Sequence, residues 1–324
     1  MKYFFLLLSV CLFSCTGNKK PNVSNIDVDI TIQRLDQDIF KDDVNNLPAK
    51  YGRFFDIYTH NIVKIGGYKD SLFSENLKMF QTNNIVDTAR NKVSEIFPNL
   101  NNINSKLTQA FKYYKYYFPE SLVPNIYSYI SGFNQSIVLT DSVIGIGLDK
   151  YLGVDYDIYP DLGIHKYQTK NMFKDKIPSD CISAWIGSEW EIDIFKHNDL
   201  ISQMIHKGKI LYATKLMLPN EADSLIFGFT REQIKWCKNN EKNMWVELID
   251  QKLIFSTDHL SIIKLTEDAP YTSIFTGESP GKACNWIGYN IVSAYMKKNP
   301  EQSLKELMEN VDYHAILEKS KYRP

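Results

Sequence analysis

Hydrophobic and polar residues alternate strictly along residues 26–33, where isoleucine or valine occupies every even position. A period of two is typical of a β-strand with one face buried. Apolar runs at 126–130, 136–139 and 144–148 predict two or three further strands. We therefore expect a small sheet formed by residues 26–34 and by the strands between residues 126 and 148.

The spacing of apolar residues changes to a helical period between Leu47 and Leu107, with interruptions at Gly66-Gly67 and Pro98. The chain after Asp161 has the composition of helices and loops only. Neither an internal repeat nor a linker divides it. These patterns predict an α+β fold, a mostly helical single domain with a small β-sheet.

Two helices of the C-terminal half have recognisable start signals. Thr230 followed by Gln233 forms a capping box, in which each side chain satisfies a free backbone N–H of the first turn. Ser279 followed by Pro280 predicts an N-cap and a first helical residue, because proline lacks the N–H that this position leaves free. We expect helices to begin at these two points.

A third helix is predicted within residues 199–218, where Ile201, Ile205 and Tyr212 lie on one apolar stripe. Gly208 lies within this segment and allows a neighbouring helix to approach closely. His206 falls well off the stripe at 100° per residue, so its side chain is expected to be exposed.

The amino terminus has the organisation of a signal peptide, with Lys2 before an apolar run at residues 3–13 and Ser14 before Cys15. This run is shorter than the roughly 20 residues that span a hydrocarbon core. Residues 12–15, Leu-Phe-Ser-Cys, resemble a lipobox, after which lipoprotein signal peptidase leaves a diacylated cysteine. We interpret residues 1–14 as a signal peptide, 15–25 as a lipidated polar tether and 26–324 as the α+β domain, with lipidation at Cys15 providing the membrane anchor.

Composition narrows the classes of partner. Lysine and arginine total 37 and aspartate and glutamate 38, so the net charge of -1 gives no electrostatic reason to expect nucleic acid. The 20 tyrosines and 18 phenylalanines predict an aromatic interior. Cys181, Cys237 and Cys284 are far apart and odd in number, which excludes a disulfide framework among them.

No motif for a metal, a cofactor or a nucleophile is present in the sequence. The six histidines include no pair spaced four residues apart, the spacing that brings two imidazoles to one metal on a helix. Glu189 and Asp193 are weak candidates for an acid pair, since on a helix from Ser179 both would fall within the stripe of Ile182 and Ile186. They could bind a cation or act as acid and base; such residues more often pair with lysine or arginine. We predict no catalytic, cofactor-binding or metal residues.

Several segments together resemble a known family. They are YYKYYFP at 113–119, LDKYLG at 148–153, QMIHKGKILY at 203–212, GFT at 228–230 with Trp236-Cys237, ESPG at 278–281 with Trp286-Ile287-Gly288, and KSKYRP at 319–324. In this order they resemble the gliding motility lipoprotein GldB family of Bacteroidota, over most of the chain.

The resemblance implies a lipid-anchored protein of the cell envelope linked to gliding motility, whose machinery is associated with type IX secretion. It also implies a distant similarity to zinc-dependent peptidases, in which one helix carries His-Glu-x-x-His and the next a Glu-Gly pair. This chain has Ala184–Ser188 and Lys207-Gly208 at those places, so a peptidase-like (zincin-like) scaffold without the metal motif is expected. The absence of acidic residues from 16–20 favours a periplasm-facing orientation, because acidic residues there resemble surface-export signals.

Two functions follow from the sequence. The first is a non-catalytic binding or scaffold protein whose partner is an envelope protein or the cell wall, with gliding or secretion machinery among the candidates and no nucleic acid involved. The alternative is a divergent hydrolase or peptidase with an unrecognised site, for which Glu189 and Asp193 are the first candidates.

Overall fold

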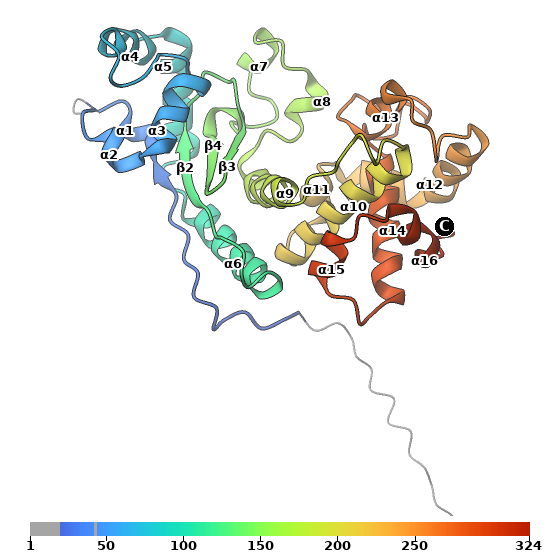
Figure 1. Cartoon of the computed structure of the whole chain (residues 1–324). Coiled ribbons are helices and arrows are strands. Elements are labelled where there is room, and N and C mark those ends of the chain that lie inside the picture. Colours follow the sequence, from blue (N-terminus) through green and yellow to red (C-terminus); the bar gives the residue numbers. More distant parts are fainter. Residues whose placement is uncertain (1–19, 42–43) are drawn as a thin grey trace, which may run out of the picture.

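The computed structural model describes residues 20–41 and 44–324. A small mixed sheet lies in the N-terminal half and helices form the rest of the described chain (Figure 1). The strands are β1 (Gln33–Arg34), β2 (Asn125–Tyr129), β3 (Ile137–Thr140) and β4 (Val143–Gly147). Their order is β1-β2-β4-β3, with β3 antiparallel to β4 and the other neighbours parallel. The predicted fold class, mostly helical with a small sheet, is confirmed.

The helices fall into two groups along the chain. Those before and around the sheet are α1 (Leu35–Asp38), α2 (Leu47–Tyr51), α3 (Arg53–Ile57), the π-helix η1 (Tyr58–Ile62), α4 (Phe73–Gln81), α5 (Asn84–Ile96), α6 (Asn101–Tyr117), the 3₁₀ turn η2 (Leu148–Lys150), α7 (Ile158–Asp161), α8 (Lys166–Thr169) and the 3₁₀ turn η3 (Lys174–Lys176). Those that follow are α9 (Ile177–Glu189), α10 (Leu200–Met217), α11 (Asp223–Phe227), α12 (Arg231–Asp250), α13 (His259–Thr266), α14 (Cys284–Lys298), α15 (Leu304–Glu309) and α16 (Tyr313–Ser320). None of the described helices is both long enough and apolar enough to cross a bilayer.

The two faces of the sheet contact different parts of the hydrophobic core. Tyr127 and Tyr129 of β2 point to a smaller cluster built on α2, α3 and α4. Ile126 of β2 and Ile144 of β4 point to the larger cluster, which continues into the C-terminal helices. Because alternate residues of one strand serve both clusters, the sheet joins them into a single body.

The prediction of a strand over residues 26–34 is only partly right. Residues 30 and 32 are buried, as the alternation predicted, but only Gln33–Arg34 pairs with β2. The backbone N–H groups of Ile30 and Ile32 instead donate to Thr108 Oγ1 at 3.0 Å and Asn104 Oδ1 at 3.2 Å on α6. Side chains of a helix therefore satisfy the backbone where the pattern suggested a second strand.

The described chain contacts the body before residue 26. Lys20 Nζ donates to Pro219 O at 3.1 Å, and Val23 is buried in the larger core cluster. Part of the segment interpreted as a tether thus packs on the body from Lys20 onward. Its remaining residues, 15–19, lie outside the described chain.

Helices α10 and α14 touch through glycine, which confirms the close approach expected at Gly208. A Cβ placed on Gly208 would lie 2.3 Å from the carbonyl carbon of Gly288. A Cβ on Gly288 would lie 1.9 Å from the carbonyl oxygen of Met204. The two backbones are in direct contact, and any side chain at either position separates them.

The two start signals in the C-terminal half have different outcomes. The capping box of Thr230 and Gln233 is present at the start of α12, as predicted. The predicted start at Ser279 is wrong, because α14 begins at Cys284. Ser279 Oγ instead accepts from the Thr272 N–H at 3.1 Å, while Thr272 Oγ1 accepts from the Ala283 N–H at 2.9 Å. These contacts hold residues 279–283 in a turn ahead of the helix.

Candidate functional site

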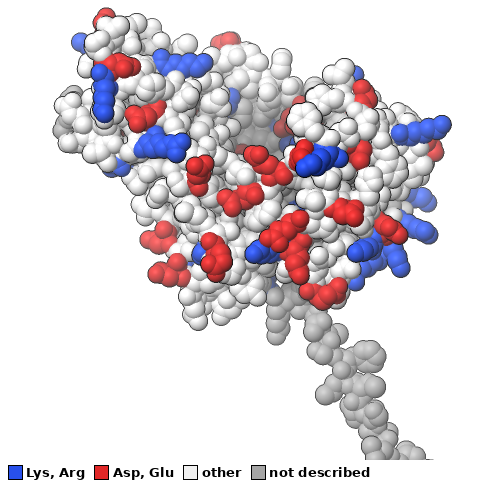
Figure 2. Space-filling model, in the orientation of Figure 1, with Lys and Arg blue, Asp and Glu red and all other residues white. Residues whose placement is uncertain are grey.

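A cleft of about 460 Å³ lies between the sheet and the C-terminal helices. Helix α9 forms its floor, the start of β3 forms one wall, and α10, α13 and the start of α14 form the other. Figure 2 shows the surface hollowed between the two halves, with basic and acidic side chains interspersed on this side of the molecule. Since the cleft brings seven elements together (β3, η3, α9, α10, α11, α13 and α14) and holds the polar groups described next, we take it as the candidate site.

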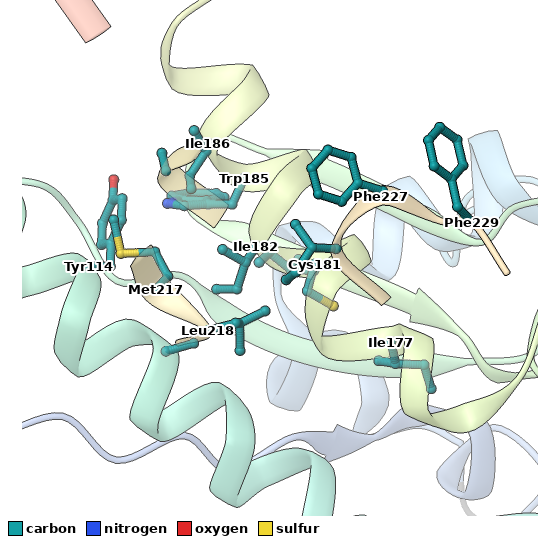
Figure 3. Packing of buried hydrophobic residues seen from close by; sticks show 14 of the residues in the cluster. Tyr114, Ile177, Cys181, Ile182, Trp185, Ile186, Met217, Leu218, Phe227 and Phe229 are labelled. Carbon is teal, nitrogen blue, oxygen red and sulfur yellow. The ribbon is translucent and has the colours of Figure 1, made fainter. Parts of the chain in front are cut away.

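Helix α9 is held in place by its apolar face. Pro178 occupies the first turn, where its missing N–H costs nothing. Cys181, Ile182 and Trp185 are buried and pack among residues of α6, α11 and the end of α10 (Figure 3). The opposite face presents Asp180, Ser183 and Ala184 to the cleft. Because the side chains of Ser183 and Ala184 are small, they leave space in the cleft above α9.

The charged side chains of the cleft are paired. The ion pairs are Lys176–Asp180 at 2.5 Å, Lys207–Glu267 at 2.6 Å and Lys282–Asp268 at 3.0 Å. Lys176 is buried and also donates to Ser179 Oγ at 3.0 Å. Asp180 Oδ2 accepts from the Tyr151 hydroxyl at 2.9 Å, and burial together with this carboxylate raises the pKa of Tyr151 well above its usual value. Both carboxylates that line the cleft, Asp180 and Glu267, are therefore engaged by lysine.

Asn285 lies on the wall formed by α14 and is 6% exposed. Its Nδ2 donates to Thr266 O at 3.0 Å, which fixes the orientation of the amide. Its Oδ1 is buried and has no hydrogen-bond partner among the described residues. This oxygen is enclosed by the protein, so its missing hydrogen bond is a cost of folding and does not offer an acceptor to the cleft.

The two acids suggested by the sequence lie elsewhere. Helix α9 ends at Glu189, so the helix that would carry both acids on one stripe does not extend to Asp193. Both residues are exposed. Asp193 pairs with Lys196 at 3.0 Å and accepts from the backbone N–H of Phe195 at 3.1 Å. Asp193 thus closes a surface turn, the ordinary alternative for such a residue.

His206 is buried, contrary to the prediction from the stripe on its helix. It is 7% exposed, and its Nδ1 lies 3.3 Å from the Tyr313 hydroxyl. Burial lowers the pKa of His206 to about 3, so the imidazole is neutral near pH 7. The stripe argument failed because α9, α14 and α16 cover α10 on several sides, which leaves it no single solvent face.

Lys209 is a buried polar residue that the sequence did not reveal. It is 1% exposed, and its Nζ donates to Met308 O and Asn310 O, both at 2.9 Å. Burial lowers its pKa to about 8. Its position inside the 18-residue helix α10 was the available signal, since a lysine surrounded by apolar residues needs partners. Here the partners are free carbonyls at the end of α15.

Cys15, the predicted lipidation site, lies outside the described residues. Within residues 20–41 and 44–324, no group of three or more histidine, cysteine or acidic side chains is arranged to hold a metal ion. Cys181, Cys237 and Cys284 are buried free thiols, and burial raises the pKa of each above its usual value. Thiols in this state are poor nucleophiles.

Comparison with known proteins gives one match. The family model described as gliding motility protein GldB matches residues 16–324. Neither a curated protein nor a solved structure matches the chain.

Proposed function

This chain belongs to the GldB family of gliding motility lipoproteins, and from that premise we propose that it is a periplasm-facing envelope protein that binds a partner protein in its cleft. The family implies a lipid-anchored protein of the envelope. We further propose that the cleft is the binding site and that its role is binding rather than catalysis.

The state of the polar groups in the cleft carries this proposal. A general base must be free to accept a proton, whereas Asp180 and Glu267 are both held by lysine. The other polar groups that line the cleft include the Ser183 hydroxyl and the Asn285 amide, which form hydrogen bonds and do not act as general bases on their own. An arrangement of this kind is suited to recognition.

Anchoring by Cys15 is consistent with the position of the described amino end. Lys20 bonds to the loop after α10, beside the ends of α6 and α15, whereas α8 and α13 lie at the opposite end of the molecule in Figure 1. The cleft includes residues of α13 and so extends toward the end away from the anchor. This arrangement leaves it accessible to a partner in the periplasm.

The proposal is tested by placing a photocrosslinking amino acid at Ser183 on the cleft floor, in the full chain expressed in its own envelope. A matched variant carries the same group at Leu122, which is 52% exposed and does not line the cleft. We expect a discrete protein adduct from position 183 and not from 122. The adduct should be lost when Ala184→Arg narrows the cleft. Equal labelling at both positions would contradict a partner in the cleft.

The hydrolase alternative predicts a different result. We expect the purified mature protein, prepared without chelator, to contain no stoichiometric zinc and to leave a peptide library uncut at neutral pH. Elemental analysis and mass spectrometry of the digest measure both. Bound zinc near one equivalent together with chelator-sensitive cleavage would replace the binding function with a catalytic one.

A further inference from the structure

We propose that the partner enters the cleft as an extended polypeptide segment that adds a strand to the outer edge of β3. This inference rests on the proposed binding function and names the chemical form of the ligand. Two observations carry it: free backbone groups on β3, and an apolar edge whose start lines the cleft.

The register of the sheet shows which backbone groups are free. The Gly147 N–H donates to Ser136 O at 2.8 Å, so this pair is a hydrogen-bonded pair of the β3–β4 ladder. Hydrogen-bonded and non-hydrogen-bonded pairs alternate in an antiparallel ladder. The backbone groups of Ile137 and Leu139 consequently point away from β4, and no hydrogen bond joins them to another described residue. Ser136 and Ile137 line the cleft, so this edge opens into it.

The two edges of the sheet differ in how they are protected. The edge strand β1 has only 2 residues, and Arg34 within it is bound to Asp36 at 2.7 Å. The edge strand β3 has 4 residues, Ile-Val-Leu-Thr, without a charge or a proline. Proteins ordinarily shield an edge by shortening it, charging it, placing proline in it or covering it with a helix or loop. Helix α9 contacts β3, but Ser136 and Ile137 at the start of the strand line the cleft. An apolar edge that lines a cleft is what strand addition requires.

The cleft also sets the side chains that the segment can carry. Residues opposite Ile137 and Leu139 project to the same face as those two side chains, which pack on the larger core cluster near α9. The floor there is formed by Ser183 and Ala184. We therefore expect small or medium apolar residues at alternate positions of the segment, without a requirement at the positions between them.

The test uses the mature protein and a phage-displayed library of random 12-residue peptides. Ile137→Pro removes one outward N–H without touching the bonds to β4, and Ile137→Ala removes the same side chain but keeps that N–H. We expect the selected peptides to bind Ile137→Pro roughly tenfold more weakly than Ile137→Ala. Thermal unfolding of both variants checks that they fold.

A second measurement leaves the protein unaltered and so does not depend on the proline variant. Each backbone nitrogen of one selected peptide is methylated in turn. Strand addition predicts that affinity falls at every second position. The inference is overturned if methylation lowers affinity equally at every position, if only changes of peptide side chains lower affinity, or if no peptide is selected. If position 183 still yields its adduct in the envelope, the proposed function stands and only the extended form of the ligand is wrong; loss of both results removes both.

Discussion

The contact between α10 and α14 makes a sharp prediction about Gly208→Ala. In an exposed helix this change is favourable by about 1 kcal/mol, because alanine has the higher helix propensity. Here the new methyl group would lie 2.3 Å from the carbonyl carbon and 2.4 Å from the carbonyl oxygen of Gly288. Backbone atoms cannot rotate away as a side chain can. The helices must move apart by about 1 Å, which disrupts packing along the whole crossing.

We expect a net loss of about 3 kcal/mol or more in the free energy of unfolding, at the upper end of overpacking costs. With an unfolding entropy of about 2.1 cal/mol/K per residue, a loss of 3 kcal/mol in a chain of this size lowers Tm by roughly 4 to 5 °C. Urea unfolding followed by circular dichroism measures the first value, and calorimetry measures the second.

Gly187→Ala is the matched control, since Gly187 lies inside the neighbouring helix α9. The nearest atom to its added Cβ is Ile210 Cδ1 at 3.7 Å, an ordinary contact. This variant should be as stable as the parent or more stable by about 0.5 to 1 kcal/mol. If Gly208→Ala also proved neutral or stabilising, the direct contact between the two backbones would be refuted.

Other predictions concern acid stability, a buried carboxylate and the anchor. The folded-state pKa of His206 is about 3, whereas its ordinary value is 6.5, so the unfolded state binds more protons than the folded state between these two pH values. The free energy of unfolding should therefore decrease by about 1.4 kcal/mol for each pH unit below 6.5. Urea titrations from pH 7 to 4 should show a smaller decrease in the free energy of unfolding for His206→Asn. Asp149 is fully buried and accepts from the backbone N–H groups of Ser131 at 3.0 Å and Phe133 at 2.6 Å. Asp149→Ala should cost about 3 kcal/mol in chemical unfolding, because it leaves both buried N–H groups without a partner, and an unchanged midpoint would show that these bonds contribute little. Cys15→Ala should abolish incorporation of labelled palmitate and partition into detergent, and retained label would exclude lipidation at this residue.

The fold could be predicted from sequence where one physical signal dominates. The capping box at Thr230 and the glycine at 208 had local meanings that tertiary structure preserved. The start at Ser279 was mistaken because its hydroxyl has a partner, Thr272, in another turn. Residues 26–32 kept their alternation of burial but took backbone partners from α6. In both errors a side chain distant in sequence accepts a backbone N–H that the prediction had assigned to a helix or a strand.

The candidate site was beyond reach of the sequence for a different reason. Its members come from β3, η3, α9, α10, α11, α13 and α14, and no motif unites them. Asn285 gives no sequence signal, since only folding places it on the wall of the cleft. Glu189 and Asp193 had a helical spacing that suggested a pair, and the end of α9 removed it. The position of a residue relative to the apolar stripe predicts its exposure only for helices with one solvent face, and α10 has no such face.

The docking of the first described residues has a consequence for biogenesis. Lys20 bonds to Pro219 across a sequence separation of 199, and Ile30 bonds to Thr108 across 78. A lipoprotein exported from its amino terminus delivers these residues to the far side of the membrane long before their partners arrive. Closing such long loops is slow and must await the later helices. The first described residues therefore stay undocked during translocation, and the completed body takes them up last.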